Sequence, residues 1–263
     1  MNYVVVKLGG HALDSLLPTS PVLVGLAQDV AELRDDGVNV VVVHGGGPQI
    51  AELLASVGLE STFKDGLRVT DAATMHYVAM ALGDVNLHIA AALNDAGLSS
   101  VGICGADATL LRSESIGEPY DRVGYAPLVN RGVIDALWSA GLTPVVSPVA
   151  LDKNAELLNC NADAVAGALA GALAADVLVL LSDIDQVRDN VDDPASARAT
   201  VTAAEIESMK RSGAVRDGMN PKMTAALDAL EGGAETILLA NGTRPHALRD
   251  ALARSIPTTE VVR

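Results

Sequence analysis

Few aromatic residues occur in this chain. Phenylalanine, tryptophan and tyrosine make up 2% of its 263 residues, whereas hydrophobic residues of all kinds make up 49%. A core built from Ala, Val, Leu and Ile suits buried parallel strands and closely packed helices. The length is sufficient for one large domain or for two intimate lobes.

Positive charge is also scarce. The sequence has 18 Lys and Arg against 33 Asp and Glu, a formal net charge of −15. Nucleic acids and anionic membranes both require basic surfaces, so neither is an expected partner. An acidic protein can still bind an anionic substrate if it gathers its few cations in one cleft.

Cysteine is nearly absent. The two cysteines, Cys104 and Cys160, do not have the spacing of a zinc site. A reduced, cytoplasmic setting is therefore expected. The first residues lack the pattern of a signal peptide, and no apolar stretch free of charge and glycine is long enough to span a membrane.

Short valine-rich runs alternate with longer segments rich in alanine and leucine. This alternation predicts an α/β fold with an open, mostly parallel sheet, in which sites gather beyond the carboxyl ends of the strands. Asp71 and Asn161 are predicted to cap helices. The predicted strands are 3–8, 38–43, 99–103, 142–147, 176–181 and 235–240, and the predicted helices are 21–34, 48–57, 72–96, 132–140, 162–174 and 222–230.

Two stretches break this alternation, and a third is polar. Residues 59–69 and 110–128 contain Gly, Pro and short β-like pieces, which predicts hairpins that flank a substrate. Residues 185–200 are polar and are predicted to form a surface loop. A soft boundary between two lobes is expected near residues 151–159.

The first predicted strand ends in Lys7-Leu8-Gly9-Gly10. Backbone N–H groups without a Cβ nearby, together with a lysine, suit a phosphate group. A plain tight turn is the alternative interpretation. The chain has neither a P-loop nor a Gly-x-Gly-x-x-Gly dinucleotide motif, so any nucleotide site must be of another kind.

The second predicted strand is followed by His44-Gly45-Gly46-Gly47-Pro48. Three glycines before a proline place free N–H groups at the positive end of a helix, which predicts a cradle for an anion. His44 is interpreted as a structural hydrogen-bonding residue rather than as a general base.

Charged residues elsewhere in the chain complete a set that suits phosphoryl transfer. Arg68 either clamps a substrate carboxylate or pairs on the surface with Asp65 or Asp71. Asp163, in the first turn of a predicted helix, either complements the helix dipole or holds two lysines in place. Lys222 would be the second of these lysines, opposite the one in the first glycine cluster.

Seven stretches of the sequence resemble the amino-acid kinase superfamily and, within it, the acetylglutamate kinases. They occur in the family's order and span nearly the whole chain. The stretches are KLGG (7–10), VVVHGGGPQI (41–50), FKDGLRVTD (63–71), NCNADAVAGALA (159–170), LLSDID (180–185), DGMNPKM (217–223) and NGTRPHAL (241–248).

This resemblance implies a three-layer αβα sandwich with a mainly parallel eight-stranded central sheet. The chain would form a single kinase domain over residues 1–263, with an acceptor-substrate lobe at about 1–155 and an ATP-binding lobe at 156–263. ATP would phosphorylate the γ-carboxylate of N-acetyl-L-glutamate in arginine biosynthesis, and Mg²⁺ would be carried by ATP rather than by protein ligands.

The resemblance also implies roles for individual residues. Lys7 and Lys222 would stabilise the transferring phosphoryl group, and Asp163 would orient both lysines. The expected substrate-binding residues are Gly45, Gly46, Gly47, Arg68, Asn159 and Asn161. The expected nucleotide-binding residues are Gly9, Gly10, Ser182, Asp183, Arg188, Val215, Arg216 and Met219.

Several positions depart from the family pattern and leave other acceptors open. His11, Leu87 and Cys104 are the departures nearest the acceptor lobe. A carrier-linked glutamate or aminoadipate, aspartate and carbamate are the alternative acceptors, and a non-catalytic amino-acid sensor is a further alternative. Because the sequence begins at the first strand, without the additional helix of arginine-inhibited hexamers, a homodimer insensitive to arginine is expected.

Overall fold

A single large sheet crosses the molecule. The computed structural model describes residues 1–13, 15–17, 19–190, 192–212 and 219–263. Within that part of the chain, eight strands pair in the order β14-β16-β15-β11-β1-β2-β8-β5, and every neighbouring pair is parallel except β15 with β16. These strands are β1 (Tyr3–Leu8), β2 (Asn39–His44), β5 (Ser100–Cys104), β8 (Thr143–Ser147), β11 (Val177–Ser182), β14 (Thr200–Thr202), β15 (Thr236–Asn241) and β16 (Thr258–Val262).

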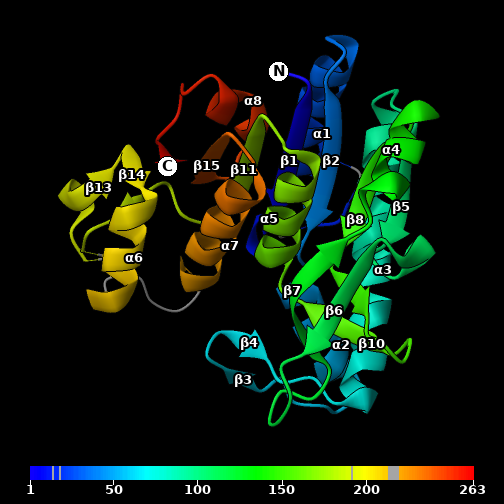
Figure 1. Cartoon of the computed structure of the whole chain (residues 1–263). Helices are drawn as coiled ribbons and strands as arrows, with labels where there is room; N and C mark the ends of the chain where they lie inside the picture. Colours follow the sequence, from blue (N-terminus) through cyan, green and yellow to red (C-terminus); the bar gives the residue numbers. More distant parts are fainter. Residues whose placement is uncertain (14, 18, 191, 213–218) are drawn as a thin grey trace.

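The sheet is apolar on both faces, as the valine-rich runs predict. Val4 and Val6 of β1 pack into one core cluster and Val5 into the other, because successive strand residues point to opposite faces. One face packs against α1 (Pro21–Asp35), α3 (Ala72–Asp95) and α8 (Ala247–Leu252). The other packs against α4 (Arg131–Ser139), α5 (Ala162–Leu173), α6 (Ala203–Ser212) and α7 (Met219–Gly232), of which α5 and α7 lie in front of the sheet in Figure 1.

The predicted mostly parallel sheet and the two predicted helix caps are confirmed. The Asp71 side chain accepts a hydrogen bond of 2.7 Å from the Thr74 N–H, and that of Asn161 accepts one of 2.8 Å from the Asp163 N–H. Helix α2 (Gly47–Ser56) begins at the last glycine of the second glycine cluster and has Pro48 in its first turn.

Two small β units flank the carboxyl edge of the sheet. The predicted hairpin at 59–69 contains β3 (Phe63–Lys64) and β4 (Leu67–Arg68). In the segment 110–128 the structure has more than a hairpin. Its strands β6 (Leu111–Ser115) and β7 (Val123–Val129) close a small barrel with β9 (Val149–Leu151) and β10 (Leu157–Cys160), which occupy the predicted lobe boundary.

The prediction of a plain loop at 185–200 was wrong in part. The short strands β12 (Val187–Arg188) and β13 (Ala197–Arg198) pair there, on either side of a 3-10 turn at Pro194–Ser196. Strands of two residues are too short to show alternation in a sequence. The sequence also did not predict β14, β16, α6 and α8, which are short or polar.

Helices α5 and α7 pack unusually closely because their contact surfaces are made of small residues. A methyl group added to Gly167 would lie 2.5 Å from the backbone oxygen of Ala225, and one added to Gly171 would lie 3.0 Å from the Cα of Gly232. Larger side chains would therefore separate the two helices. This close approach brings the first turns of both helices together at the same edge of the sheet.

Within the described part of the chain, no helix combines the length and the apolar character needed to cross a membrane.

Candidate active site

A cavity lies at the carboxyl ends of β1, β2 and β11. The turn after β1 contributes Gly9 and Gly10, and the turn after β2 contributes three glycines. Strand β11 contributes Ser182, its last residue, and the next residue, Asp183, also lines the cavity. Helices α2 and α5 begin at this cavity, and α7 reaches it through Lys222 in its first turn. The positive ends of helix dipoles favour anions at such a place.

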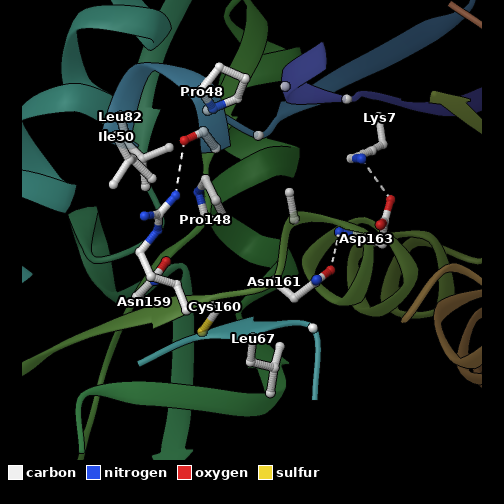
Figure 2. Close-up of a pocket in the computed structure, with 18 of the residues that line it drawn as sticks. Lys7, Pro48, Ile50, Leu67, Leu82, Pro148, Asn159, Cys160, Asn161 and Asp163 are labelled. Atoms are coloured by element: carbon white, nitrogen blue, oxygen red, sulfur yellow. Dashed lines mark hydrogen bonds and ion pairs between the residues drawn. The ribbon is translucent and has the colours of Figure 1, made fainter. Parts of the chain in front are cut away.

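Two lysines share one buried carboxylate in the cavity. The Lys7 ammonium lies 2.8 Å from Oδ1 of Asp163, and the Lys222 ammonium donates a hydrogen bond of 3.1 Å to Oδ2. Figure 2 shows Lys7 and Asp163 facing each other at one side of the cavity. The structure thus brings together the three charged residues predicted for catalysis.

The environment of this cluster changes the pKa values of its members. Burial lowers the pKa of Lys7 below its ordinary value; the Lys222 charge acts in the same direction, while Asp163 opposes both. Burial alone would raise the pKa of Asp163, but the two ammonium groups outweigh burial and hold that pKa below its usual value. Asp163 therefore remains a carboxylate at neutral pH.

The lowered pKa of Lys7 has a measurable consequence for catalysis. If its ammonium group is required, kcat/KM for nucleotide will decline on the alkaline side at a pH below 10.5, the ordinary value for lysine. The sign follows because a lysine with a lowered pKa loses its proton, and its charge, earlier as pH rises. The measurement is the pH profile of kcat/KM.

Lys7→Arg is the matched variant for this profile, because an arginine keeps its charge throughout the range. The alkaline decline should move to higher pH in the variant. A decline that starts only above 10.5 in the unmodified protein, or one that Lys7→Arg leaves in place, contradicts the assignment.

The two glycine turns meet backbone to backbone. A methyl group added to Gly10 would lie 2.9 Å from the backbone nitrogen of Gly47 and 2.9 Å from Cδ of Pro48, and one added to Gly45 would lie 3.3 Å from the Gly10 nitrogen. Only glycine fits Gly10 without displacing backbone. Gly9, Gly10, Gly45, Gly46 and Gly47 all line the cavity, as the sequence predicts.

Arg68, at the end of β4, is a buried cation without a carboxylate partner among the described residues. It is 7% exposed, and its guanidinium donates a hydrogen bond of 2.9 Å to the Gly47 carbonyl and another to the Ser61 hydroxyl. The centre of the Phe63 ring lies 4.6 Å from the guanidinium carbon. Of the two interpretations from sequence, the surface ion pair with Asp65 or Asp71 does not occur. A buried guanidinium without a counterion favours an anionic ligand.

The two predicted asparagines both line the cavity, but their side chains make different hydrogen bonds. The Nδ2 group of Asn159, in β10, donates a hydrogen bond of 3.1 Å to the Thr70 hydroxyl. Asn161 uses its Oδ1 to cap α5, where it accepts from two backbone N–H groups. Its amide nitrogen is therefore the part of the Asn161 side chain left to donate to a ligand.

The predicted nucleotide-binding residues are only partly placed at the cavity. Ser182 and Asp183 line it together with the first glycine pair, whereas Arg188 in β12 and Met219 in α7 do not. Met219, the first residue of α7, packs against the hydrophobic core instead. Val215 and Arg216 lie outside the residues that the structure describes.

An apolar wall completes the cavity, and no pattern in the sequence predicted it. Ile50, Leu82 and Pro148 contribute to this wall, and Figure 2 shows Ile50 and Leu82 side by side. Cys160 also lines the cavity, and burial raises the pKa of its thiol to about 11, which keeps it neutral. Phe63, whose ring packs against the Arg68 guanidinium, is also part of this apolar wall. Apolar side chains carry no motif that would mark them as site residues.

Two of the departures from the family pattern lie away from the cavity. Leu87 is 68% exposed on the outer face of α3, and Cys104 ends β5 without lining the cavity. The side chain of His11 lies outside the described part of the structure. The departures at Leu87 and Cys104 therefore give no reason to expect a different acceptor substrate.

Comparison with known proteins gives consistent matches over most of the chain. The model of the amino acid kinase family matches residues 2–241. Acetylglutamate kinase of Symbiobacterium thermophilum is 40% identical over 255 residues, covering 93% of this chain and 86% of that protein, and acetylglutamate kinase of Methanocaldococcus jannaschii is 38% identical over 257 residues, covering 93% and 84%.

Solved structures share the fold. The smu.665 structure from Streptococcus mutans has a TM-score of 0.83 at 25% identity and covers 99% of this chain and 98% of that one. Carbamate kinase from Giardia lamblia bound to AMP-PNP has a TM-score of 0.70 at 18% identity, covering 99% and 98%.

Proposed function

Because the chain belongs to the amino acid kinase family, we propose that it uses ATP to phosphorylate the γ-carboxylate of N-acetyl-L-glutamate, a step of arginine biosynthesis. The observation that carries the proposal is the pair of lysines on buried Asp163 where two glycine turns meet. The acceptor is chosen because relatives 36–40% identical over most of their length are named acetylglutamate kinase.

The proposed reaction needs no general base. A carboxylate is already a nucleophile at neutral pH, and the obstacle is its repulsion from ATP. An oxygen of the γ-carboxylate attacks the γ-phosphorus, the bond from phosphorus to the β–γ bridging oxygen breaks, and ADP leaves with that electron pair. Catalysis then consists of alignment and charge stabilisation.

The residues of the chain divide these tasks. Lys7 and Lys222 would lie beside the transferring phosphoryl group, and Asp163 would hold both in place. The glycine N–H groups would bind phosphate oxygens, and Arg68 would bind the α-carboxylate of the acceptor. We propose that Mg²⁺ arrives with the phosphates of ATP and neutralises part of their charge; the described residues include no cluster of three or more His, Cys, Asp or Glu arranged to hold a metal.

The finer assignments belong to the same proposal. We assign the fold as the three-layer αβα sandwich of this family, with acceptor binding in about residues 1–155 and ATP binding in 156–263. Ser182 and Asp183 would border the nucleotide, and Asn159 and Asn161 would contact the acceptor. We also propose a cytoplasmic location. The free thiols of Cys104 and Cys160 are consistent with a reducing compartment.

A homodimer is also proposed, and helix α3 supports it. Met80 and Leu87 are 52% and 68% exposed and lie about two helical turns apart, so they share the outer face of α3. A second copy of the chain would cover these apolar side chains. Light scattering tests this: a mass equal to one chain of 26.9 kDa at working concentration would contradict the dimer.

The activity is tested by two linked measurements. ADP formation should require N-acetyl-L-glutamate, ATP and Mg²⁺ together, and hydroxylamine should trap the product as a hydroxamate because an acyl phosphate is attacked at its carbonyl carbon. Glutamate, aspartate and carbamate are the control acceptors. Turnover with one of these but not with N-acetyl-L-glutamate would reject the acceptor, and no turnover with any of them would favour a non-catalytic sensor.

A further inference from the structure

A buried polar relay lies beneath the second glycine turn and outside the cavity. His44, the last residue of β2, is fully buried. Its Nδ1 lies 2.9 Å from the Gly45 carbonyl oxygen, and its Nε2 lies 3.0 Å from Nδ2 of Asn86 in α3. Nδ2 of Asn86 also donates a hydrogen bond of 3.0 Å to the carbonyl oxygen of Val145 in β8.

The chemistry of these groups fixes every proton in the relay. A backbone carbonyl can only accept, so the Asn86 group that faces Val145 must be the NH₂ group. That same NH₂ group faces Nε2 of His44, which must therefore accept. The proton of a neutral ring then lies on Nδ1, from which it is donated to the Gly45 carbonyl. Burial supports a neutral ring, because it lowers the pKa of His44 to about 4.

This hydrogen bond sets the direction of the next peptide unit. In a trans peptide the carbonyl and the following N–H point in opposite directions. Holding the Gly45 carbonyl against the buried ring therefore directs the Gly46 N–H away from the core. The backbone nitrogens of Gly46 and Gly47 would lie 3.3 Å and 2.9 Å from a methyl group on Gly10, so both lie beside the first glycine turn.

We propose that His44 and Asn86 are positioning residues of the anion cradle, in which Asn86 fixes the tautomer of His44 and His44 fixes the Gly45–Gly46 peptide. Neither side chain touches the cavity, so neither is a catalytic residue. The proposal rests on the proposed function in one respect only, namely that the cradle binds phosphate oxygens during turnover.

Two substitutions of His44 separate this role from a purely structural one. The amide nitrogen of asparagine takes about the position of Nδ1, so His44→Asn keeps a donor for the Gly45 carbonyl and loses the contact with Asn86. The amide of glutamine reaches about the position of Nε2, so His44→Gln keeps a contact with Asn86 and loses the donor. Each variant loses one buried hydrogen bond, so their melting temperatures should be similar.

Activity should separate the two variants. We expect His44→Gln to lower kcat about 10-fold or more, because the cradle's donors lose their direction, and His44→Asn to lower it much less. Affinity for AMP-PNP, measured by calorimetry, should follow the same order. Equal kcat and equal affinity in the two variants, or a greater loss in His44→Asn, would overturn the proposal.

The tautomer provides a readout that does not depend on turnover. ¹⁵N chemical shifts of the His44 ring should show a neutral ring protonated on Nδ1, and Asn86→Leu should allow the Nε2-protonated form to appear. A ring protonated on Nε2 in the unmodified protein overturns the proposal. If the unmodified protein shows no kinase activity, the proposed function fails, while the tautomer and the AMP-PNP affinities still decide the role of His44.

Discussion

Replacing Lys222 with alanine is expected to lower kcat by about 10²–10³, equivalent to about 3–4 kcal/mol, which is the usual effect of removing one well-placed charge-stabilising donor. Lys222 and Lys7 both contact the carboxylate of Asp163, so in the proposed mechanism the variant would leave the transferring phosphoryl group with one lysine ammonium instead of two. KM for both substrates should change less than kcat, since the developing charge is greatest in the transition state. Steady-state kinetics measures both parameters.

Lys210→Ala is the matched control for this variant. Lys210, in α6, donates a hydrogen bond of 3.0 Å to Thr224 of α7, the helix that carries Lys222. It does not line the cavity, so its loss should leave kcat within about twofold. Fluorescence of Trp138, the single tryptophan, reports whether each variant is folded. If kcat is unchanged in folded Lys222→Ala, this lysine has no part in the mechanism.

Replacing Arg68 with alanine is expected to raise KM for the acceptor by about 10- to 100-fold, because charge-assisted hydrogen bonds contribute about 1.5–3 kcal/mol each. The guanidinium is buried between Gly47, Ser61 and the ring of Phe63, and no described carboxylate pairs with it. KM for ATP should change much less, since the nucleotide is proposed to bind on the other side of the transferring group.

Arg131→Ala is the control for loss of an arginine. Arg131 pairs with Asp135 at 3.0 Å on the surface of α4, and such exposed pairs contribute little to stability or function. Arg68→Lys adds a test of geometry, because lysine keeps the charge but not the bidentate fork. A rise in KM for ATP equal to the rise for the acceptor would place Arg68 in the nucleotide site instead.

The central strands were predictable because their own residues determine them. A run such as β1, buried on both faces, has few alternatives to a central parallel strand. Helix α8 was not predictable, because its first turn depends on a residue far away in the sequence. Its preceding residue, His246, has a positive φ and no side-chain cap. Instead Asp29 of α1 accepts hydrogen bonds from His246 Nδ1, at 2.7 Å, and from the Arg249 N–H, at 3.0 Å.

The candidate site also has parts that the sequence predicts and parts that depend on tertiary contacts. Lys7 near the end of β1 and the glycines that follow β1 and β2 could be predicted, because the topology of a parallel sheet brings strand ends to one edge. The contact of Asp163 with Lys222 depends on how closely α5 and α7 pack, which is set by glycines whose partners only the fold identifies. The apolar wall at Ile50 and Leu82 depends wholly on tertiary packing.

The cluster of two lysines and one carboxylate has one net positive charge within a chain whose formal net charge is −15. An approaching nucleotide is an anion. The negative charge of the whole chain repels it, whereas the positive cluster in the cavity attracts it. At 0.01 M salt the screening length is about 30 Å and the nucleotide is repelled by the whole molecule, whereas at 0.15 M it is about 8 Å and the charges that line the cavity dominate. Added salt should therefore accelerate the association of ATP over this range, opposite to its effect on enzymes whose overall charge attracts the substrate.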